Sequence, residues 1–185
     1  MHLLALCGSL RAASINAAFL RAFARLAPAE VDVRLFPSLG ALPLFDPDLE
    51  ADLPPAVRAL HAAVARADGL VIASPEYAHG VSGTIKNALD WLVSFEPFIH
   101  KPTAVVNASP RAHHADDALR ETLRTMSAGL VGEASFKLPL LGARLDEDAM
   151  AASAEVAEVV ARAVAELRAE RERQRAADVP VFPIR

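Results

Sequence analysis

Short apolar runs alternate with helical patterns along most of this 185-residue chain, and this alternation constrains the fold more than any other feature. Short apolar runs bounded by helices are typical of parallel strands that are buried on both faces. We therefore expect an α/β fold in which helices cover both faces of one parallel sheet. The expected strands cover residues 3–7, 31–36, 70–73, 103–107 and 134–138, and the expected helices cover about residues 14–27, 55–67, 82–93, 114–128 and 146–174.

Five strands and five helices in alternation fit a flavodoxin-like, doubly wound five-stranded sheet with the strand order 2-1-3-4-5. In this order strands 1 and 3 are neighbours, and ligands bind beyond the carboxyl ends of the strands at this point. The loops that follow strands 1, 3 and 4 should therefore form one site. We expect residues 1–175 to form one domain, residues 38–55 to form an irregular excursion within it, and residues 176–185 to be a C-terminal tail.

The composition excludes several classes of protein. The net charge of −4 combines intermixed acids and bases, so there is no electrostatic footprint for nucleic acid. No apolar run approaches the roughly 18 residues of a membrane span, and the first strand is too short for the apolar core of a signal peptide. The single cysteine, Cys7, excludes an internal disulfide and suits a reducing compartment. We therefore expect a cytoplasmic protein that interacts with neither membrane nor nucleic acid.

The loop after the first strand carries the donors that a phosphate needs. Ser9, Ser14 and Asn16 can donate side-chain hydrogen bonds, and Arg11 can bind two phosphate oxygens at once. A helix that starts near Ser14 adds free backbone N–H groups and the positive end of its dipole. The loop lacks the Gly-Lys-Ser/Thr ending of a P-loop and two of the three glycines of a dinucleotide fingerprint, so it suits one terminal monophosphate. The alternative is a capped polar turn with Arg11 in solvent.

The loop after the third strand reads Ser-Pro-Glu-Tyr-Ala-His-Gly over residues 74–80. Tyr77 offers an apolar face with a polar edge at the end of the sheet. Gly80 and Gly83 should relieve crowding, so that a flat ligand could lie close to the backbone. The N–H groups of such a turn could bond to ring carbonyls and nitrogens.

In these two loops the chain resembles the NADPH-dependent FMN reductase family, which includes quinone, azo-dye and chromate reductases of flavodoxin-like fold. The matching motifs are Gly-Ser-Leu-Arg-x-x-Ser-x-Asn at 8–16 and Pro-Glu-Tyr-x-His at 75–79, with Lys-Asn-Ala-Leu-Asp-Trp downstream at 86–91. The resemblance implies that FMN is the cofactor, with its phosphate at the first loop and its isoalloxazine ring at the second, and that NADPH or NADH is the co-substrate. The cofactor-binding residues that it implies are Ser9, Arg11, Ser14, Ile15, Asn16, Pro75, Glu76, Tyr77, Ala78, His79, Gly80 and Ser109.

The sequence departs from the family pattern in two places. Ala78 stands where the family usually has Asn, which removes a side-chain hydrogen bond. The loop after strand 4 usually reads Ser-Pro-Gly followed by Gly-Gly, but here it is Ser-Pro-Arg-Ala-His-His-Ala over residues 109–115. His113 and His114 have no acidic or cysteine partner at ligand spacing, so we expect no metal site, and a polar rim near the ring is one alternative role.

The resemblance implies an FMN-dependent NAD(P)H oxidoreductase that passes a hydride from nicotinamide to FMN and then to a quinone, an azo compound or a metal oxyanion. The flavin supplies this chemistry, so no catalytic side chain is expected. Two alternatives are a flavodoxin-like electron carrier and a flavin-binding protein without reductase turnover. The resemblance also implies a homodimer or homotetramer, with residues 38–55 and the helix that carries Lys86, Asp90 and Trp91 as the candidate interface.

Overall fold

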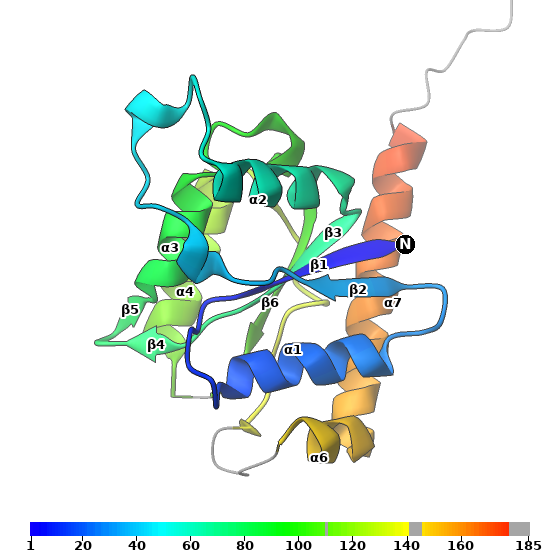
Figure 1. Cartoon of the computed structure of the whole chain (residues 1–185). Coiled ribbons are helices and arrows are strands. Elements are labelled where there is room, and N and C mark those ends of the chain that lie inside the picture. The colour runs from blue at the N-terminus through cyan, green and yellow to red at the C-terminus, as the bar shows by residue number, and fades with distance from the viewer. Residues whose placement is uncertain (110, 141–145, 178–185) are drawn as a thin grey trace, which may run out of the picture.

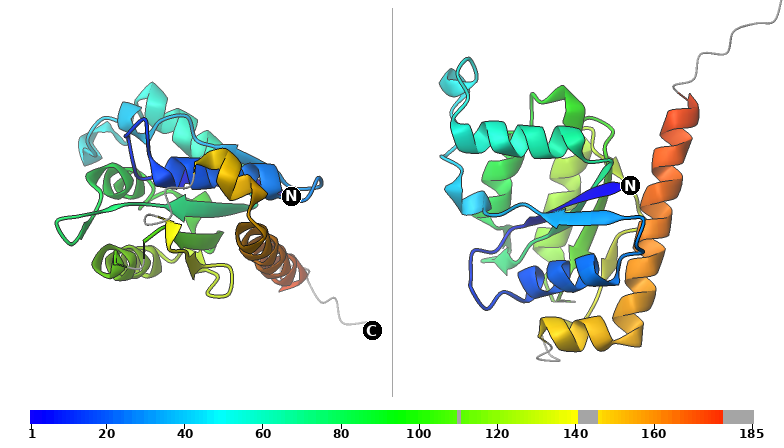
Figure 2. Two further views of the ribbon diagram at one scale, coloured as in Figure 1. Left: turned by 90° about the horizontal axis from the view of Figure 1, so that it is seen from below. Right: turned by 45° about the vertical axis from the view of Figure 1, so that its right-hand side comes forward.

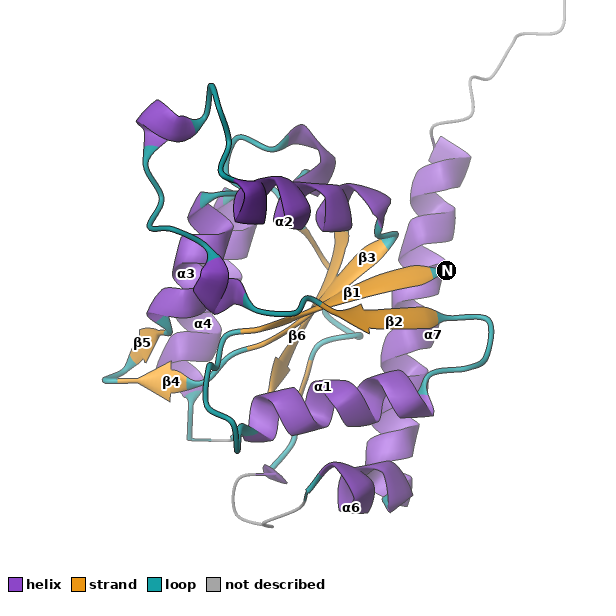
Figure 3. Ribbon diagram, in the orientation of Figure 1, coloured by secondary structure: helices purple, strands orange, loops and turns teal. Residues whose placement is uncertain are grey.

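The computed structural model describes residues 1–109, 111–140 and 146–177, and helices surround a central sheet in it (Figures 1 and 3). The sheet strands are β1 (His2–Cys7), β2 (Asp32–Leu35), β3 (Gly69–Ala73), β6 (Pro102–Asn107), β7 (Gly129–Leu130) and β8 (Phe136–Lys137), and a separate hairpin is formed by β4 (Glu76–Tyr77) and β5 (Gly80–Val81). The α-helices are α1 (Ile15–Leu26), α2 (Pro55–Arg66), α3 (Gly83–Asp90), α4 (His113–Thr125), α6 (Glu147–Ala152) and α7 (Ala154–Ala177), and short 3₁₀ helices cover Leu39–Ala41, Pro47–Leu49 and Glu96–Phe98.

The sheet is parallel and has the order β2-β1-β3-β6-β7, with β8 also paired to β6. This confirms the flavodoxin-like order expected from the sequence. The expected fifth strand over residues 134–138 contains β8, but β7 was not expected, and the two short strands pair with β6 one after the other. The chain leaves the sheet between them after Val131, whose N–H still donates to the Thr103 carbonyl of β6 at 3.0 Å.

A serine side chain replaces the missing backbone pairing at this interruption. The Ser135 hydroxyl accepts a hydrogen bond from the Val105 N–H at 3.0 Å and donates one to the Val131 carbonyl at 2.9 Å. The N–H group of a central strand is thereby satisfied although no strand residue faces it. A hydrophobicity pattern cannot reveal this arrangement, because it depends on one hydroxyl that reaches across the gap.

Side chains that alternate along the strands build one core on each face of the sheet. Leu3 and Ala5 of β1 face the layer of α1, α6 and α7, where they pack with Phe19, Phe23 and Val160. Leu4 and Leu6 face α2, α3 and α4 on the opposite side, where they pack with Leu60, Ile85 and Leu119. The strands are thus buried from both sides, which is why their sequences read as continuous apolar runs.

The C-terminal region contains two helices, so the expectation of one helix over residues 146–174 was wrong. Ser153 has an extended backbone (ψ 122°) that ends α6, and its hydroxyl accepts a hydrogen bond from the Val156 N–H at the start of α7. Helix α7 then runs along one side of the molecule (Figure 2) and includes residues 176–177. The rest of the expected tail, residues 178–185, lies outside the described residues. None of the described helices combines the length and apolarity that a membrane span needs.

The irregular segment before α2 is fastened to α3 by three hydrogen bonds. The Pro43 carbonyl accepts from the Trp91 indole N–H at 2.8 Å and from the Asn87 amide at 2.9 Å, and the Asn87 carbonyl oxygen accepts from the Phe45 N–H at 2.8 Å. Trp91 is 2% exposed. Its side chain therefore stabilises the fold of its own subunit, which removes Trp91 from the surface available to a partner.

Candidate functional site

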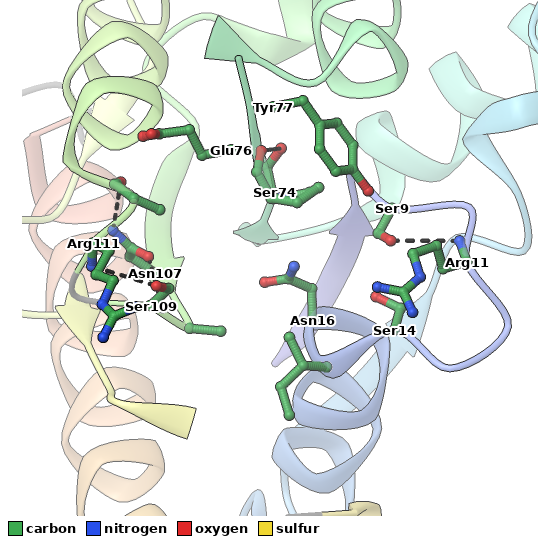
Figure 4. A pocket seen from close by; sticks show the side chains of 14 residues that line it. Ser9, Arg11, Ser14, Asn16, Ser74, Glu76, Tyr77, Asn107, Ser109 and Arg111 are labelled. Atoms are coloured by element: carbon green, nitrogen blue, oxygen red, sulfur yellow. Dashed lines mark hydrogen bonds between the residues drawn. The ribbon is translucent and has the colours of Figure 1, made fainter. Parts of the chain in front are cut away.

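A cleft of about 320 Å³ opens at the carboxyl ends of β1, β3 and β6. Figure 4 shows Arg11 and Arg111 on opposite sides of it, with Tyr77 and Glu76 between. This is the edge at which the strand order reverses, where ligands bind in folds of this topology. The lining residues are Ser9, Arg11, Ser14, Ile15, Asn16, Ser74, Pro75, Glu76, Tyr77, Asn107, Ala108, Ser109, Arg111 and Ala112.

The loop after β1 presents donors to one end of the cleft. Ser14 is the N-cap of α1: its hydroxyl oxygen accepts from the Ala17 N–H at 3.2 Å, which leaves the hydroxyl hydrogen free to donate. The Ser9 hydroxyl accepts from the Arg11 N–H at 3.4 Å and tightens the turn. The Arg11 side chain is exposed and lines the cleft. Two hydroxyls, one guanidinium and a helix N-terminus thus converge as an anion site would require.

Asn16 carries an unsatisfied buried atom beside these donors. The residue is 4% exposed, and its Oδ1 atom has no hydrogen-bond partner among the described residues. Its amide points into the cleft (Figure 4). Leaving a buried acceptor unpaired costs about 1–3 kcal/mol, so a ligand that brings a hydroxyl or N–H group here would remove a real penalty.

The loops after β1 and β3 are held together at Gly8. The Gly8 N–H donates to the Ala73 carbonyl at 2.8 Å, and the Gly8 carbonyl accepts from the Ser82 hydroxyl at 2.7 Å. Ser82 also shares a hydrogen bond of 3.2 Å with the Ser74 hydroxyl. A Cβ atom on Gly8 would lie 2.4 Å from the Ser74 Oγ. The close approach of the two loops therefore requires glycine.

The hairpin β4–β5 projects from the β3 end of the cleft and was not expected from the sequence. Ala78 and His79 form its two-residue turn, and both have positive φ, 50° and 59°. A turn with two positive φ values matches the twist of a hairpin but favours Asn and Gly. The departure at Ala78 therefore has a backbone consequence, because alanine tolerates this conformation poorly.

Replacing Ala78 with Gly should stabilise the protein by about 1 kcal/mol, because Gly adopts positive φ without steric cost. Ala78→Asn should stabilise it by a smaller amount. The matched control is Ala62→Gly on the exposed side of α2, which should destabilise by about 0.5–1 kcal/mol. Urea denaturation measures both free energies of unfolding. If both glycine variants change the free energy of unfolding in the same direction, the turn is not strained.

Glu76 connects the hairpin to α4. One carboxylate oxygen accepts from the Ala115 N–H at 2.9 Å, and the other lies 3.2 Å from the His79 Nδ1. Ala112, the N-cap of α4, supplies no capping side chain, so Glu76 caps this helix from a different element. The Ala115 N–H, with His79 and His114 nearby, lowers the pKa of the Glu76 carboxyl. Glu76 is therefore ionised and fixed at neutral pH.

The loop after β6 is held by its own amide and hydroxyl groups. The buried Asn107 amide donates to the Ala112 carbonyl at 2.9 Å, and its oxygen accepts from the Ser109 N–H at 2.9 Å. The Ser109 hydroxyl in turn accepts from the Arg111 N–H at 3.3 Å. The loop is thus built without the glycines that the resemblance suggested, and it forms the wall of the cleft opposite the first loop (Figure 4).

Most of the residues singled out from the sequence lie around this cleft. Ser9, Arg11, Ser14, Ile15, Asn16, Pro75, Glu76, Tyr77 and Ser109 line it, whereas Ala78, His79 and Gly80 form the hairpin and lie outside the lining. Sequence reasoning did not select Ser74, Asn107 or Ala108 as site residues. A usable signal existed, because Ser74 directly follows the third expected strand and Asn107 ends the fourth.

Comparison with known proteins gives a consistent set of relatives. A family model described as NADPH-dependent FMN reductase matches residues 1–140. A quinone reductase of Escherichia coli K12 is 37% identical over 113 residues, 59% of this chain and 60% of that protein. A 2-hydroxy-1,4-benzoquinone reductase of a Burkholderia species is 44% identical over 84 residues, 45% of each chain. The matched region thus spans about 60% or less of these two relatives.

Two solved structures share the fold at low sequence identity. The flavoenzyme NAD(P)H:(acceptor) oxidoreductase FerB of Paracoccus denitrificans has a TM-score of 0.64 and 23% identity, with 95% of this chain and 93% of that chain covered. A flavodoxin of Pseudomonas aeruginosa has a TM-score of 0.59 and 13% identity, with coverage of 91% and 99%. These two likenesses concern the fold alone.

Proposed function

This chain belongs to the NADPH-dependent FMN reductase family, and from that membership we propose that it is an FMN-dependent NAD(P)H oxidoreductase that reduces quinones. The observation that carries the proposal is the meeting of both family motifs at one cleft, on the ligand-binding edge of the sheet. Relatives named quinone reductase support the acceptor class. Azo compounds and metal oxyanions are further acceptors to be tested in the same assay.

The residues at the β1 end of the cleft fit FMN. The Ser9 and Ser14 hydroxyls and the Arg11 guanidinium would hold the phosphate beside the N-terminus of α1. The unpaired Asn16 Oδ1 lies farther into the cleft and would accept a hydrogen bond from a ribityl hydroxyl. When bound, FMN supplies the hydride-accepting and hydride-donating chemistry of the reaction.

The chain's own residues would position the flavin ring in the cleft. Tyr77, which is 53% exposed, offers an aromatic face beside the ring position. Pro75 and the fixed Glu76 would set the backbone that faces the ring edge, and Ser109 and Arg111 would form the opposite wall. Backbone N–H groups aimed at the ring would stabilise negative charge on it, so no side-chain acid or base is required.

Absorbance and turnover measurements test this function together. The purified protein is loaded with FMN and mixed with NADPH or NADH, first without an acceptor and then with benzoquinone. We expect flavin bleaching with the nicotinamide and continuous nicotinamide oxidation once quinone is present. Bound flavin without NAD(P)H oxidation would indicate a flavin-binding protein, and a stable semiquinone on titration would indicate an electron carrier. Either result would contradict the proposed reductase.

We also propose that the protein is a homodimer or homotetramer, as the family resemblance implies. Leu44 and Val93 are 84% and 56% exposed. Leu44 directly follows Pro43, and Val93 is two residues after Trp91. The hydrogen bond from the Trp91 indole to the Pro43 carbonyl brings these two segments together. Light scattering at micromolar concentration should therefore give at least twice the monomer mass, and Leu44→Glu should shift the mass toward the monomer. The control Ala62→Glu should leave it unchanged, and a monomeric wild type would contradict the proposal.

A further inference from the structure

Three imidazole rings lie in contact at the rim of the cleft. The ring centroids of His79 and His114 are 4.5 Å apart, and those of His113 and His114 are 4.1 Å apart. The rings come from two elements, since His79 is in the turn of the β4–β5 hairpin and the other two begin α4. All three residues are exposed. We refer to these three side chains as the imidazole cluster.

The cluster is connected directly to two residues that line the cleft. His79 Nδ1 lies 3.2 Å from the Glu76 carboxylate, and His113 Nδ1 lies 3.2 Å from the Arg111 carbonyl. Glu76 and Arg111 both contribute to the cleft wall. A ligand in the cleft that extends past this wall would therefore meet the imidazole cluster.

Few carboxylates lie near the imidazole cluster. The Glu76 carboxylate touches His79, but its second oxygen is occupied by the Ala115 N–H. Asp116 is buried and paired with Arg120 at 3.1 Å and Lys137 at 3.2 Å. Asp117, one helical turn beyond His113, is the other carboxylate near the start of α4. Arg111 adds a permanent positive charge from the cleft side. Protonation of the imidazoles thus makes this rim cationic.

The ligand that fits such a rim is an anion with several acceptor atoms. The described residues contain no group of three or more His, Cys, Asp or Glu side chains arranged to hold a metal ion. A phosphate monoester offers three acceptor oxygens and is largely dianionic above about pH 6. Imidazolium and guanidinium groups both donate charge-assisted hydrogen bonds to such an anion.

We infer that the imidazole cluster and Arg111 form a phosphate-monoester site that receives the 2′-phosphate of NADPH and so favours NADPH over NADH. This inference rests on the proposed function, because the nicotinamide must enter the same cleft. The flavin phosphate would occupy a different place, since Arg11 lies across the cleft from Arg111 (Figure 4). The two positively charged walls would therefore bind two different phosphates.

Binding of adenosine 2′,5′-bisphosphate tests the site without turnover. At pH 6.5 calorimetry should show that the FMN-loaded protein binds this ligand about tenfold or more tightly than adenosine 5′-monophosphate. A triple variant, His79→Asn with His113→Gln and His114→Gln, should lose this difference while its affinity for the monophosphate stays unchanged. His2→Gln is the matched control, because His2 is exposed on β1 and pairs with Asp32. It should behave as the wild type.

The outcomes separate this inference from the proposed function. If wild type and triple variant show the same bisphosphate preference, the phosphate site is overturned whatever the enzyme does. If inorganic phosphate perturbs the NMR signals of the three histidines at the same concentrations as the bisphosphate does, the cluster binds any phosphate, and its assignment to the 2′-phosphate of NADPH is overturned. If the bisphosphate preference is lost as expected but the wild type oxidises neither nicotinamide, the site stands and the reductase proposal fails. In an active enzyme, the NADPH/NADH ratio of kcat/KM should fall about tenfold in the triple variant at pH 6.5.

Discussion

Gly8→Ala should weaken FMN binding by about tenfold to a hundredfold and should also destabilise the fold. The new Cβ would lie 2.4 Å from the Ser74 Oγ, 2.8 Å from the Ser74 Cβ and 2.9 Å from the Ser82 Oγ. Rotation of the Ser74 hydroxyl alone cannot relieve contact with its Cβ, so the two loops must separate. Overpacking of this kind costs about 1–3 kcal/mol, and separation also breaks the hydrogen bond from Ser82 to the Gly8 carbonyl.

Two variants identify the cause of this effect. Gly132→Ala is the control, because nothing lies within 4 Å of a Cβ at Gly132, and its stability and FMN affinity should be unchanged. Adding Ser74→Gly to Gly8→Ala removes both contacts with Ser74 and should restore part of the affinity. Fluorescence titration with FMN and urea denaturation measure the two effects. Wild-type FMN affinity in Gly8→Ala would mean that the spacing of the loops does not shape the site.

FMN should bind far more tightly than riboflavin, and Arg11→Ala should reduce the FMN affinity about ten- to a hundred-fold. The Arg11 side chain lines the cleft beside the Ser9 and Ser14 hydroxyls. A hydrogen bond to a charged group contributes about 1.5–3 kcal/mol, which corresponds to this range of affinity. Riboflavin lacks the phosphate, so its affinity should be the same in the wild type and in Arg11→Ala.

Comparing four dissociation constants, for two flavins and two proteins, isolates the contribution of the Arg11–phosphate contact. The control variant is Arg34→Ala on β2, where the guanidinium is exposed and paired with Asp32 at 2.7 Å. It should bind both flavins as the wild type does. Equal affinities of the wild type for FMN and riboflavin would contradict the phosphate site and, with it, the proposed cofactor.

The sequence was sufficient to predict the order of the strands and the edge of the sheet at which the cleft opens. Apolar runs that alternate with helices leave few arrangements in which every strand is buried on both faces. Once β1 and β3 are neighbours, the loops that follow them must meet. The hydroxyl and guanidinium groups at 9–16 and the Pro-Glu-Tyr motif therefore line one cleft, as expected. The two motifs also indicated the family, because they combine unusual residues at fixed spacing.

The sequence misassigned features that depend on single long-range contacts. The Ser135 hydroxyl accepts a hydrogen bond from the Val105 N–H where the last strand is interrupted. The hydrophobic periodicity of a sequence gives no indication that a side-chain hydroxyl takes the place of strand pairing. For Trp91 the sequence left a core or an interface position open, and the structure shows its indole N–H bonded to the Pro43 carbonyl, 48 residues away. The hairpin was missed because Ala and His occupy a type of turn that is usually recognised in a sequence by Asn and Gly.

What the sequence by itself determined is which chemical groups the protein carries, and in which order they leave the sheet. Only the tertiary structure decided how they are used. It joined Glu76 to the N-terminus of α4, brought three histidines from two elements into contact, and left the Asn16 oxygen buried without a partner. The physical reason is that local propensity and periodicity act over a few residues, whereas these contacts arise between loops that meet only after the sheet has formed.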